Sequence, residues 1–156
     1  MSEPRQLRCG IAKVPSRDPR PRILVFSTNS ISDPGIDLAG SAHMHYSPGV
    51  LTIPVPCSSG IRPSWVLHAI EAGFDGVFIA ADGTDCAYVP DCTTRTAKIV
   101  AQAHRLLQDK GHDPRRLKMA AICSVCAESF VSYVERLGAD LKRLAVERAR
   151  QEEVKP

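Results

Sequence analysis

The sequence predicts an α/β protein: a flavodoxin-like, four-stranded parallel sheet with flanking helices, folded as a single domain behind an N-terminal arm. From residue 22 onward, short apolar runs alternate with helical patterns four times. Every connection between successive runs is long enough to hold a helix, as neighbouring parallel strands require. A chain of 156 residues suits one domain of this kind. We place a basic arm at residues 1–20 and the α/β domain at residues 21–150.

The four strands are predicted from short apolar runs that are rich in β-branched residues. The run at 76–81, GVFIAA, is apolar throughout, which is typical of a strand buried on both faces. Pro54 lies inside the second run, and because proline cannot donate a ladder hydrogen bond, it indicates an edge strand or an early end. The predicted strands are 22–27, 50–55, 76–81 and 117–122.

The helices are predicted from their end signals and from apolar periodicity. Asp33 before Pro34 is typical of a helix start, and so is Pro63 at a first helical position. Gly73 and Gly111 are typical of the residues that end helices. The predicted helices are 35–43, 63–72, 93–110 and 127–150. In the last one, apolar residues spaced by four and three form a single seam: Phe130, Val134, Leu137, Leu141 and Leu144.

Composition excludes several classes of protein. The sequence is 44% hydrophobic and 24% charged, which is ordinary for a globular protein. The net charge of +3 comes from residues 1–20, so the domain has no excess charge to attract nucleic acid. No apolar run approaches the roughly 18 residues of a transmembrane segment, and the N-terminus lacks the apolar stretch of a secretory signal. We therefore expect a cytoplasmic protein, in a compartment where structural disulfides are rare.

Five of the six cysteines follow predicted strands. Cys57 follows the second strand, Cys86 and Cys92 follow the third, and Cys123 and Cys126 follow the fourth. The C-terminal ends of parallel strands share one edge of the sheet, where ligands bind, so we expect these thiols to converge. An iron–sulfur cluster needs about four thiolates, and we assign Cys57, Cys86, Cys123 and Cys126 as the ligands, with Cys92 as an alternative. Four thiolates also suit zinc, and the spacing does not separate the two metals.

Other interpretations of these residues stay open. Cysteine is often an inert, buried apolar residue. The Cys123-x-x-Cys126 pair, after a strand and before a helix, is also typical of a dithiol redox motif. Asp82, Asp85 and Asp91 lie in the loop after the third strand, where carboxylates serve either acid–base chemistry or turn formation. The sequence contains no glycine-rich nucleotide motif and no nucleophile motif, so it does not predict a nucleotide site or a catalytic triad.

Three segments of the sequence carry a family resemblance. They are GIDLAGSAHMHYSPGV at 35–50, VPCSSGIRPSWVLHAIEAGFDGVFIA at 55–80 and DGTDCAYV at 82–89. Residues 22–141 resemble the delta, iron–sulfur subunit family of methyl-viologen-reducing hydrogenase and of heterodisulfide reductase-associated complexes. That family relays electrons through a [2Fe-2S] cluster, between a hydrogenase or formate dehydrogenase and the flavin-bearing A subunit of heterodisulfide reductase. The resemblance implies an electron-transfer subunit with a heterodisulfide reductase A-like flavoprotein partner, and an accessory role that is not catalytic alone.

The sequence departs from the family pattern in two loops. Residues 27–31 read STNSI where the family has Cys-Cys-Asn-Trp-Cys, and residues 80–87 keep only the second of two family cysteines, Cys86. Cys57 matches a family cysteine. Hydroxyl oxygens replace thiolate poorly on iron, so the family site cannot operate unchanged. Either the cluster is rebuilt at the same edge with the Cys-x-x-Cys pair, which is our working hypothesis, or the chain is a cluster-free docking subunit.

Overall fold

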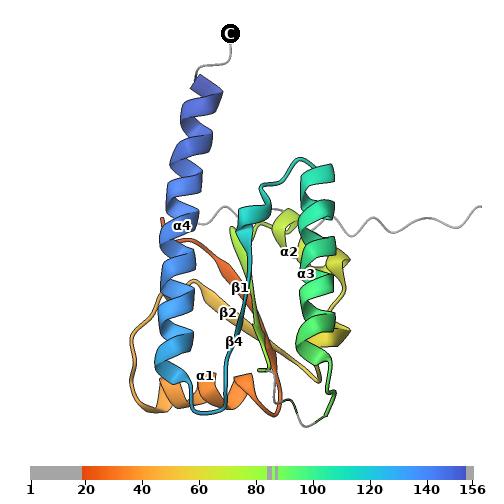
Figure 1. Ribbon diagram of the computed structural model, residues 1–156. Helices are drawn as coiled ribbons and strands as arrows, with labels where there is room; N and C mark the ends of the chain where they lie inside the picture. The colour runs from red at the N-terminus through yellow and green to blue at the C-terminus, as the bar shows by residue number, and fades with distance from the viewer. Residues whose placement is uncertain (1–18, 84–85, 87, 154–156) are drawn as a thin grey trace, which may run out of the picture.

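The structure, a computed structural model, describes residues 19–83, 86 and 88–153. The predicted arm, apart from its last two residues, falls outside the described part, as do Cys9 and Asp85. Strands and helices alternate as predicted (Figure 1). The elements are β1 (Ile23–Thr28), α1 (Ser32–Ser41), β2 (Val50–Val55), the 3-10 turn η1 (Ser58–Gly60), α2 (Pro63–Glu71), β3 (Gly76–Ala81), α3 (Cys92–Asp109), the 3-10 turn η2 (Pro114–Arg116), β4 (Leu117–Ala121) and α4 (Ala127–Glu153).

The sheet has the strand order β2-β1-β3-β4, and every neighbouring pair is parallel. This is the order of a flavodoxin-like, doubly wound sheet, so the predicted fold class is confirmed. The order reverses between β1 and β3, and the loops that follow these two strands border the crevice where such folds bind ligands. Pro54 lies in β2 at one edge of the sheet, as its missing amide proton indicated.

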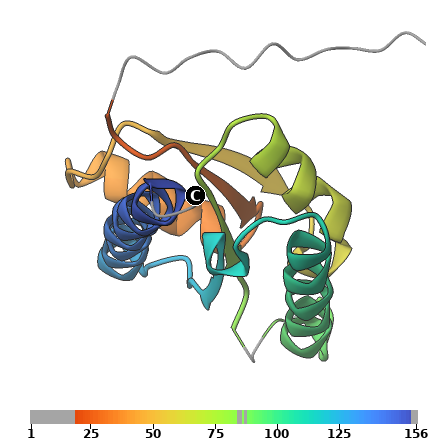
Figure 2. The same ribbon diagram turned by 90° about the horizontal axis from the view of Figure 1, so that it is seen from above.

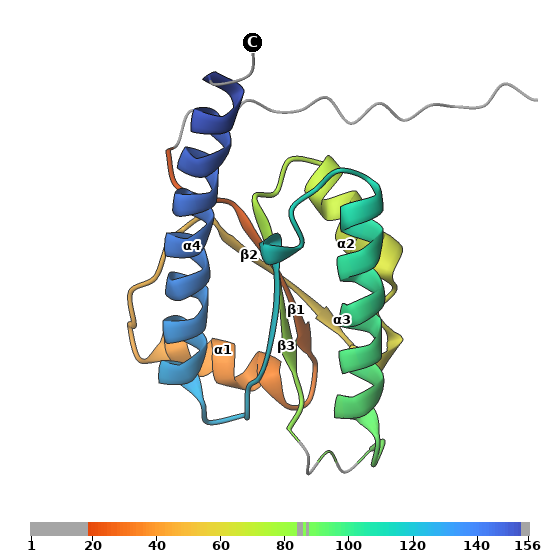
Figure 3. The same ribbon diagram turned by 45° about the horizontal axis from the view of Figure 1, so that its top comes forward.

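Helices cover both faces of the sheet. One face carries α2 and α3, and the other carries α1 and α4 (Figures 1 and 3). The view from above separates the three layers (Figure 2). Every residue of β3 is buried, which confirms that this strand lies between two helical layers.

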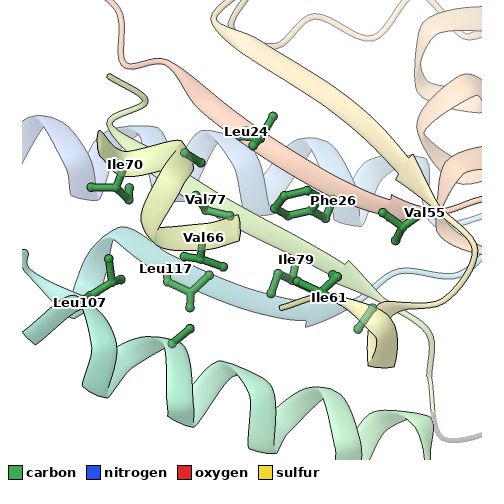
Figure 4. Close-up of a cluster of buried hydrophobic side chains, with 13 residues drawn as sticks. Leu24, Phe26, Val55, Ile61, Val66, Ile70, Val77, Ile79, Leu107 and Leu117 are labelled. Carbon is green, nitrogen blue, oxygen red and sulfur yellow. The ribbon is translucent and has the colours of Figure 1, made fainter. Parts of the chain in front are cut away.

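Two apolar cores fill the layers. The first lies under α2 and α3 and includes Val66, Ile79 and Leu107 (Figure 4). The second lies under α1 and α4, where the predicted α4 seam is buried from Phe130 to Leu141. Burial of these seams, rather than helix propensity alone, is what holds the helices on the sheet.

The helix ends agree with the sequence signals at α2 and α3 and differ at α1. Gly73 and Gly111 have positive φ angles of 103° and 75°, a backbone conformation that glycine adopts without steric cost. The helix α1 begins at Ser32, three residues before the predicted start. Asp33 therefore lies inside the helix, where its carboxylate accepts a hydrogen bond from the Ser27 hydroxyl at 2.7 Å. The prediction that Asp33 precedes the helix is wrong.

No helix in the described ranges combines the length and the apolar character needed to cross a bilayer.

Candidate metal centre

Cys57 and Cys92 lie side by side although 35 residues separate them. Cys57 follows β2, and the turn η1 that comes next packs against α3, of which Cys92 is the first residue. The two sulfur atoms are 3.6 Å apart. Cys92 is fully buried, whereas Cys57 is partly exposed. The backbone of η1 therefore brings a thiol from one edge of the sheet to the N-terminus of α3.

Serine hydroxyls contact both sulfur atoms. The Ser59 hydroxyl lies 3.0 Å from the Cys57 sulfur, and the Ser58 hydroxyl lies 3.4 Å from the Cys92 sulfur. Ser58 also contacts the Thr96 hydroxyl at 3.0 Å. Hydroxyl groups in these positions can donate hydrogen bonds to thiolates, a contact that orients metal ligands and tunes a bound metal.

A carboxylate and a third thiol lie close to Cys92. Asp82 and Cys86 come from the loop after β3, and both are buried. The ligand atoms of Asp82, Cys86 and Cys92 all lie within 4.8 Å of one another. The Cys86 thiol donates to a carboxylate oxygen of Asp82 at 3.5 Å. Asp82, Cys86 and the first residue of α3 thus place three metal-binding side chains close together.

The Asp82 carboxylate is held at the point where the strand order reverses. Its second oxygen accepts a hydrogen bond from the hydroxyl of Thr28, the last residue of β1. Thr28 in turn contacts the Ser32 hydroxyl at 3.1 Å, and Ser32 donates to the Ala80 carbonyl at 2.8 Å. Because all of these groups are buried and hydrogen-bonded, the carboxylate has a fixed orientation.

The donor set fits a thiophilic metal. Two thiolates bound to one metal at about 2.3 Å in tetrahedral geometry lie roughly 3.8 Å apart, and the Cys57 and Cys92 sulfurs are separated by 3.6 Å. Cys86 and Asp82 supply a third sulfur and an oxygen within reach of Cys92. A four-thiolate set is typical of iron–sulfur centres, whereas the donors near Cys92 are two further thiols and a carboxylate.

A positive charge lies beside the two contacting thiols. Arg95 forms an ion pair with Asp91 at 2.8 Å on the first turn of α3. The pKa of Arg95 is raised, chiefly by its hydrogen bond to Asp91 and further by attraction to Cys57 and Cys92. The pair is exposed to solvent, so its field is screened.

The other two predicted ligands, Cys123 and Cys126, are joined to each other. Their sulfur atoms form a disulfide in the loop between β4 and α4. Cys126 packs against the core under α1 and α4, on the other face of the sheet from η1 and α3. A disulfide has no thiolate to offer a metal, so a ligand role for this pair stays a prediction that first requires reduction.

The structure therefore joins only part of the predicted set. It brings Cys57 and Cys86 into one region together with Cys92, which the sequence suggested only as an alternative. Asp82 was predicted in acid–base or turn roles, and its place among the thiols was missed. One signal could have indicated it: Asp82 is the first residue after a fully buried strand, next to the strand-order reversal.

Comparison with known proteins gives the family. The profile of the family described as methyl-viologen-reducing hydrogenase, delta subunit, matches residues 23–145. The chain belongs to this family. Among its relatives, the iron-sulfur D subunit of the F420-non-reducing hydrogenase from Archaeoglobus profundus is 24% identical over 129 residues, which cover 83% of this chain and 94% of the relative. The iron-sulfur D subunit of the vhc F420-non-reducing hydrogenase from Methanococcus voltae is 42% identical over 69 residues, 44% of this delta-subunit chain and 48% of the relative.

A second kind of relative is much larger than this delta-subunit chain. The A subunit of the ferredoxin:CoB-CoM heterodisulfide reductase from Methanosarcina mazei is 28% identical over 125 residues. The match covers 80% of this chain but only 16% of that relative. A delta-subunit-like segment is thus one part of a longer redox protein in that organism. These relatives make this chain a member of a family of redox-complex subunits.

Proposed function

We propose that this chain is an iron–sulfur electron-transfer subunit of a multisubunit redox complex. Its centre, a [2Fe-2S] cluster, would be held by Cys57, Cys86 and Cys92, with Asp82 as the fourth ligand. The observation that carries the proposal is the position of Cys92, which contacts Cys57 on one side and has Asp82 and Cys86 within 4.8 Å on the other. The iron–sulfur naming of the delta-subunit relatives supports it.

The centre, when bound, supplies one-electron transfer, and the chain's own residues set the conditions for it. Thr28 holds Asp82 so that a carboxylate oxygen faces Cys86 and Cys92. The hydroxyls of Ser58 and Ser59 lie within donating distance of the sulfurs and would raise the reduction potential by stabilising the more negative state. Cys57 is the partly exposed member of the set, so it marks the side on which a partner's cofactor would approach.

The partner that fits best is a flavoprotein of the heterodisulfide reductase A type. The reductase A subunit from Methanosarcina mazei contains a segment similar to this chain within one polypeptide. Segments that are fused in one organism commonly bind each other when they are separate chains in another. We therefore expect this chain to dock on a heterodisulfide reductase A-like flavoprotein and to exchange electrons with it.

The test is metal and sulfide analysis of the full chain, purified anaerobically with its partner subunits, together with electron paramagnetic resonance. The unmodified chain should contain two irons and two acid-labile sulfides per copy, the content of one [2Fe-2S] cluster, and give a signal on one-electron reduction. Cys92→Ser should lose most of the iron. Cys123→Ser with Cys126→Ser is the matched control, because it removes two cysteines that lie outside the proposed ligand set and should keep the iron.

Other results point to other functions. If Cys92→Ser kept its iron and the Cys123 and Cys126 variant lost it, the result would support the ligand set that the sequence predicted, which includes Cys123 and Cys126 and not Cys92. One zinc per chain without sulfide would mean a structural metal site, which three thiolates and a carboxylate also suit. A colourless, metal-free chain that still assembles with its partners would be the cluster-free docking subunit.

A further inference from the structure

The disulfide between Cys123 and Cys126 has no part in the function proposed above. It lies in the short loop between β4 and α4, and both of its cysteines are partly exposed. Ser124 and Val125, the two residues between them, are exposed, and Val125 is 76% exposed. An accessible disulfide at a loop tip can be reached by another thiol.

The bond contributes little to holding the fold. It closes a loop with only two intervening residues. The shorter the loop that a disulfide closes, the less entropy the disulfide removes from the unfolded chain. The loop is fixed without it, because the Cys126 amide donates to the Cys123 carbonyl at 3.1 Å. The residues on either side, Ile122 and Ala127, are buried in the core. The sulfur–sulfur bond can therefore break and re-form while the backbone stays in place.

The surroundings favour thiolate at this position. Cys126 directly precedes α4, and its carbonyl accepts the first helical hydrogen bond, from the Phe130 amide at 3.0 Å. The free amides of the first turn point toward this end of the helix and stabilise negative charge there. Glu128 in the same turn is exposed, so water screens its opposing charge. A thiolate released at Cys126 is thus a good leaving group.

A surface hollow of about 440 Å³ lies next to Cys126, with an apolar side and a polar side that Glu128 and Ser129 line. Leu38, Ala42 and Met44 line it from the α1 side, and Val125 lines it from the disulfide loop. Leu38 is 41% exposed, so two large apolar side chains face solvent beside the sulfur atoms. The hollow suits an apolar segment that flanks a pair of cysteines on another protein.

We propose that Cys123 and Cys126 form a second redox site, a thiol–disulfide couple that exchanges two electrons with a dithiol protein docked over this hollow. A thiolate of the partner attacks the Cys123 sulfur, the bond between Cys123 and Cys126 breaks, and Cys126 leaves as a thiolate. The partner's second thiolate then attacks the partner sulfur of the mixed disulfide and releases Cys123. The partner dithiol is oxidised to a disulfide, and Cys123 and Cys126 take up two electrons and two protons.

This site is independent of the metal centre, so its test is separate. The full chain is treated with dithiothreitol, quenched with a maleimide at set times, and mapped by peptide mass spectrometry. We expect Cys123 and Cys126 to be labelled together and at least about tenfold faster in the folded chain than in urea, because unfolding removes the helix amides that stabilise the Cys126 thiolate. A disulfide that is reduced only as fast as the chain unfolds would overturn the proposal.

Two variants test the partner and the direction of attack. Val125→Asp should slow reduction by a thioredoxin-type dithiol protein at least about fivefold, since it places a charge in the apolar contact, and leave the dithiothreitol rate unchanged. Equal effects on both rates would refute docking over the hollow. The trapping test uses a dithiol protein whose second cysteine is replaced by serine, since that thiolate would otherwise release Cys123. Cys126→Ser, with Cys123 activated by Ellman's reagent, should hold this partner as a mixed disulfide on Cys123. Trapping only on Cys126 in a Cys123→Ser variant activated in the same way would refute the proposed order of attack. Iron is measured in the same samples, so loss of the metal centre is recognised separately.

Discussion

Replacement of Gly35 by alanine tests how closely α1 packs against the Cys123–Cys126 loop. A Cβ atom on Gly35 would lie 2.5 Å from the Cys123 carbonyl oxygen, which is backbone and cannot rotate away. To reach an ordinary contact, the carbonyl or the helix must move by nearly 1 Å. Overpacking of this kind costs about 1–3 kcal/mol. The shift also disturbs the hydrogen bond that this carbonyl accepts from the Cys126 amide, worth about 1 kcal/mol.

The same helix offers a matched control. Gly40 also lies in α1, and a Cβ atom there would meet nothing within 4 Å. Alanine has a higher helix propensity than glycine by about 1 kcal/mol, a gain that both variants share and that offsets part of the clash at Gly35. We therefore expect Gly40→Ala to raise the free energy of unfolding by about 0.5–1 kcal/mol and Gly35→Ala to lower it by about 1–3 kcal/mol.

The assay is urea unfolding followed by far-UV circular dichroism, with thermal melts as a check. In a protein of this size 1 kcal/mol corresponds to roughly 2–4 °C in melting temperature, so the two variants should differ by at least about 4 °C. The urea m-values should stay equal, which shows that the effect lies in the folded state. Equal stabilisation by both variants would refute the close approach of α1 to the Cys123 carbonyl.

Three further substitutions probe the metal site, the core and the acid stability. Thr28→Val keeps the shape of the side chain but removes the hydroxyl that donates to Asp82. It should weaken metal binding roughly 10–100-fold, as measured by competition with a chelator. An unchanged affinity would contradict the role of Thr28 in orienting Asp82. Phe130→Ala empties a fully buried position and should cost about 3–5 kcal/mol in urea unfolding, and a loss below about 1 kcal/mol would contradict its core position. The pKa of Asp113 is lowered, chiefly by its hydrogen bond from Arg115, although burial acts in the opposite direction. This carboxylate therefore stabilises the fold at pH values above its unfolded pKa of about 3.9. The stabilisation is lost as the pH falls through the lower pKa of the folded state. Asp113→Asn should therefore cost a few tenths of a kcal/mol at pH 7 and nothing in strong acid, and a penalty that grows with acid would contradict this sign.

The sheet was predictable because each of its strands is specified by local sequence. An apolar run such as GVFIAA is typical of a strand between two helical layers, and the missing amide proton of Pro54 indicated an edge position or an early end for β2. The start of α1 was not predictable in the same way. It depends on the Ser32 hydroxyl, which donates to the Ala80 carbonyl on a strand 48 residues away. The apolar periodicity of a helix carries no information about a contact between residues so far apart in the sequence.

The metal centre was predictable in part for a related reason. The rule that parallel strands end at a common edge placed Cys57 and Cys86 in the same region. It did not give the path of the backbone beyond each strand. Because η1, which follows Cys57, packs against α3, the sulfur of Cys57 lies next to that of Cys92, the first residue of α3. The loop after β4 leads Cys123 and Cys126 to the opposite face, where they bond to each other. Ligand choice thus depends on loop geometry, which pattern analysis does not resolve.

The loop after β1 bears on why we propose the centre on the α3 side. Where the family resemblance predicts cysteines, this chain has Ser27, Thr28 and Ile31, and the buried hydroxyls of Ser27 and Thr28 are joined by that of the next residue, Ser32. Each of these hydroxyls has a hydrogen-bond partner, and together they connect β1, α1 and the loop after β3. Hydroxyls with satisfied hydrogen bonds stabilise the fold but bind iron poorly, so the β1 side of the crevice contributes a hydrogen bond to Asp82 and no thiolate. The thiols that remain for a metal are therefore those on the α3 side, Cys57, Cys86 and Cys92.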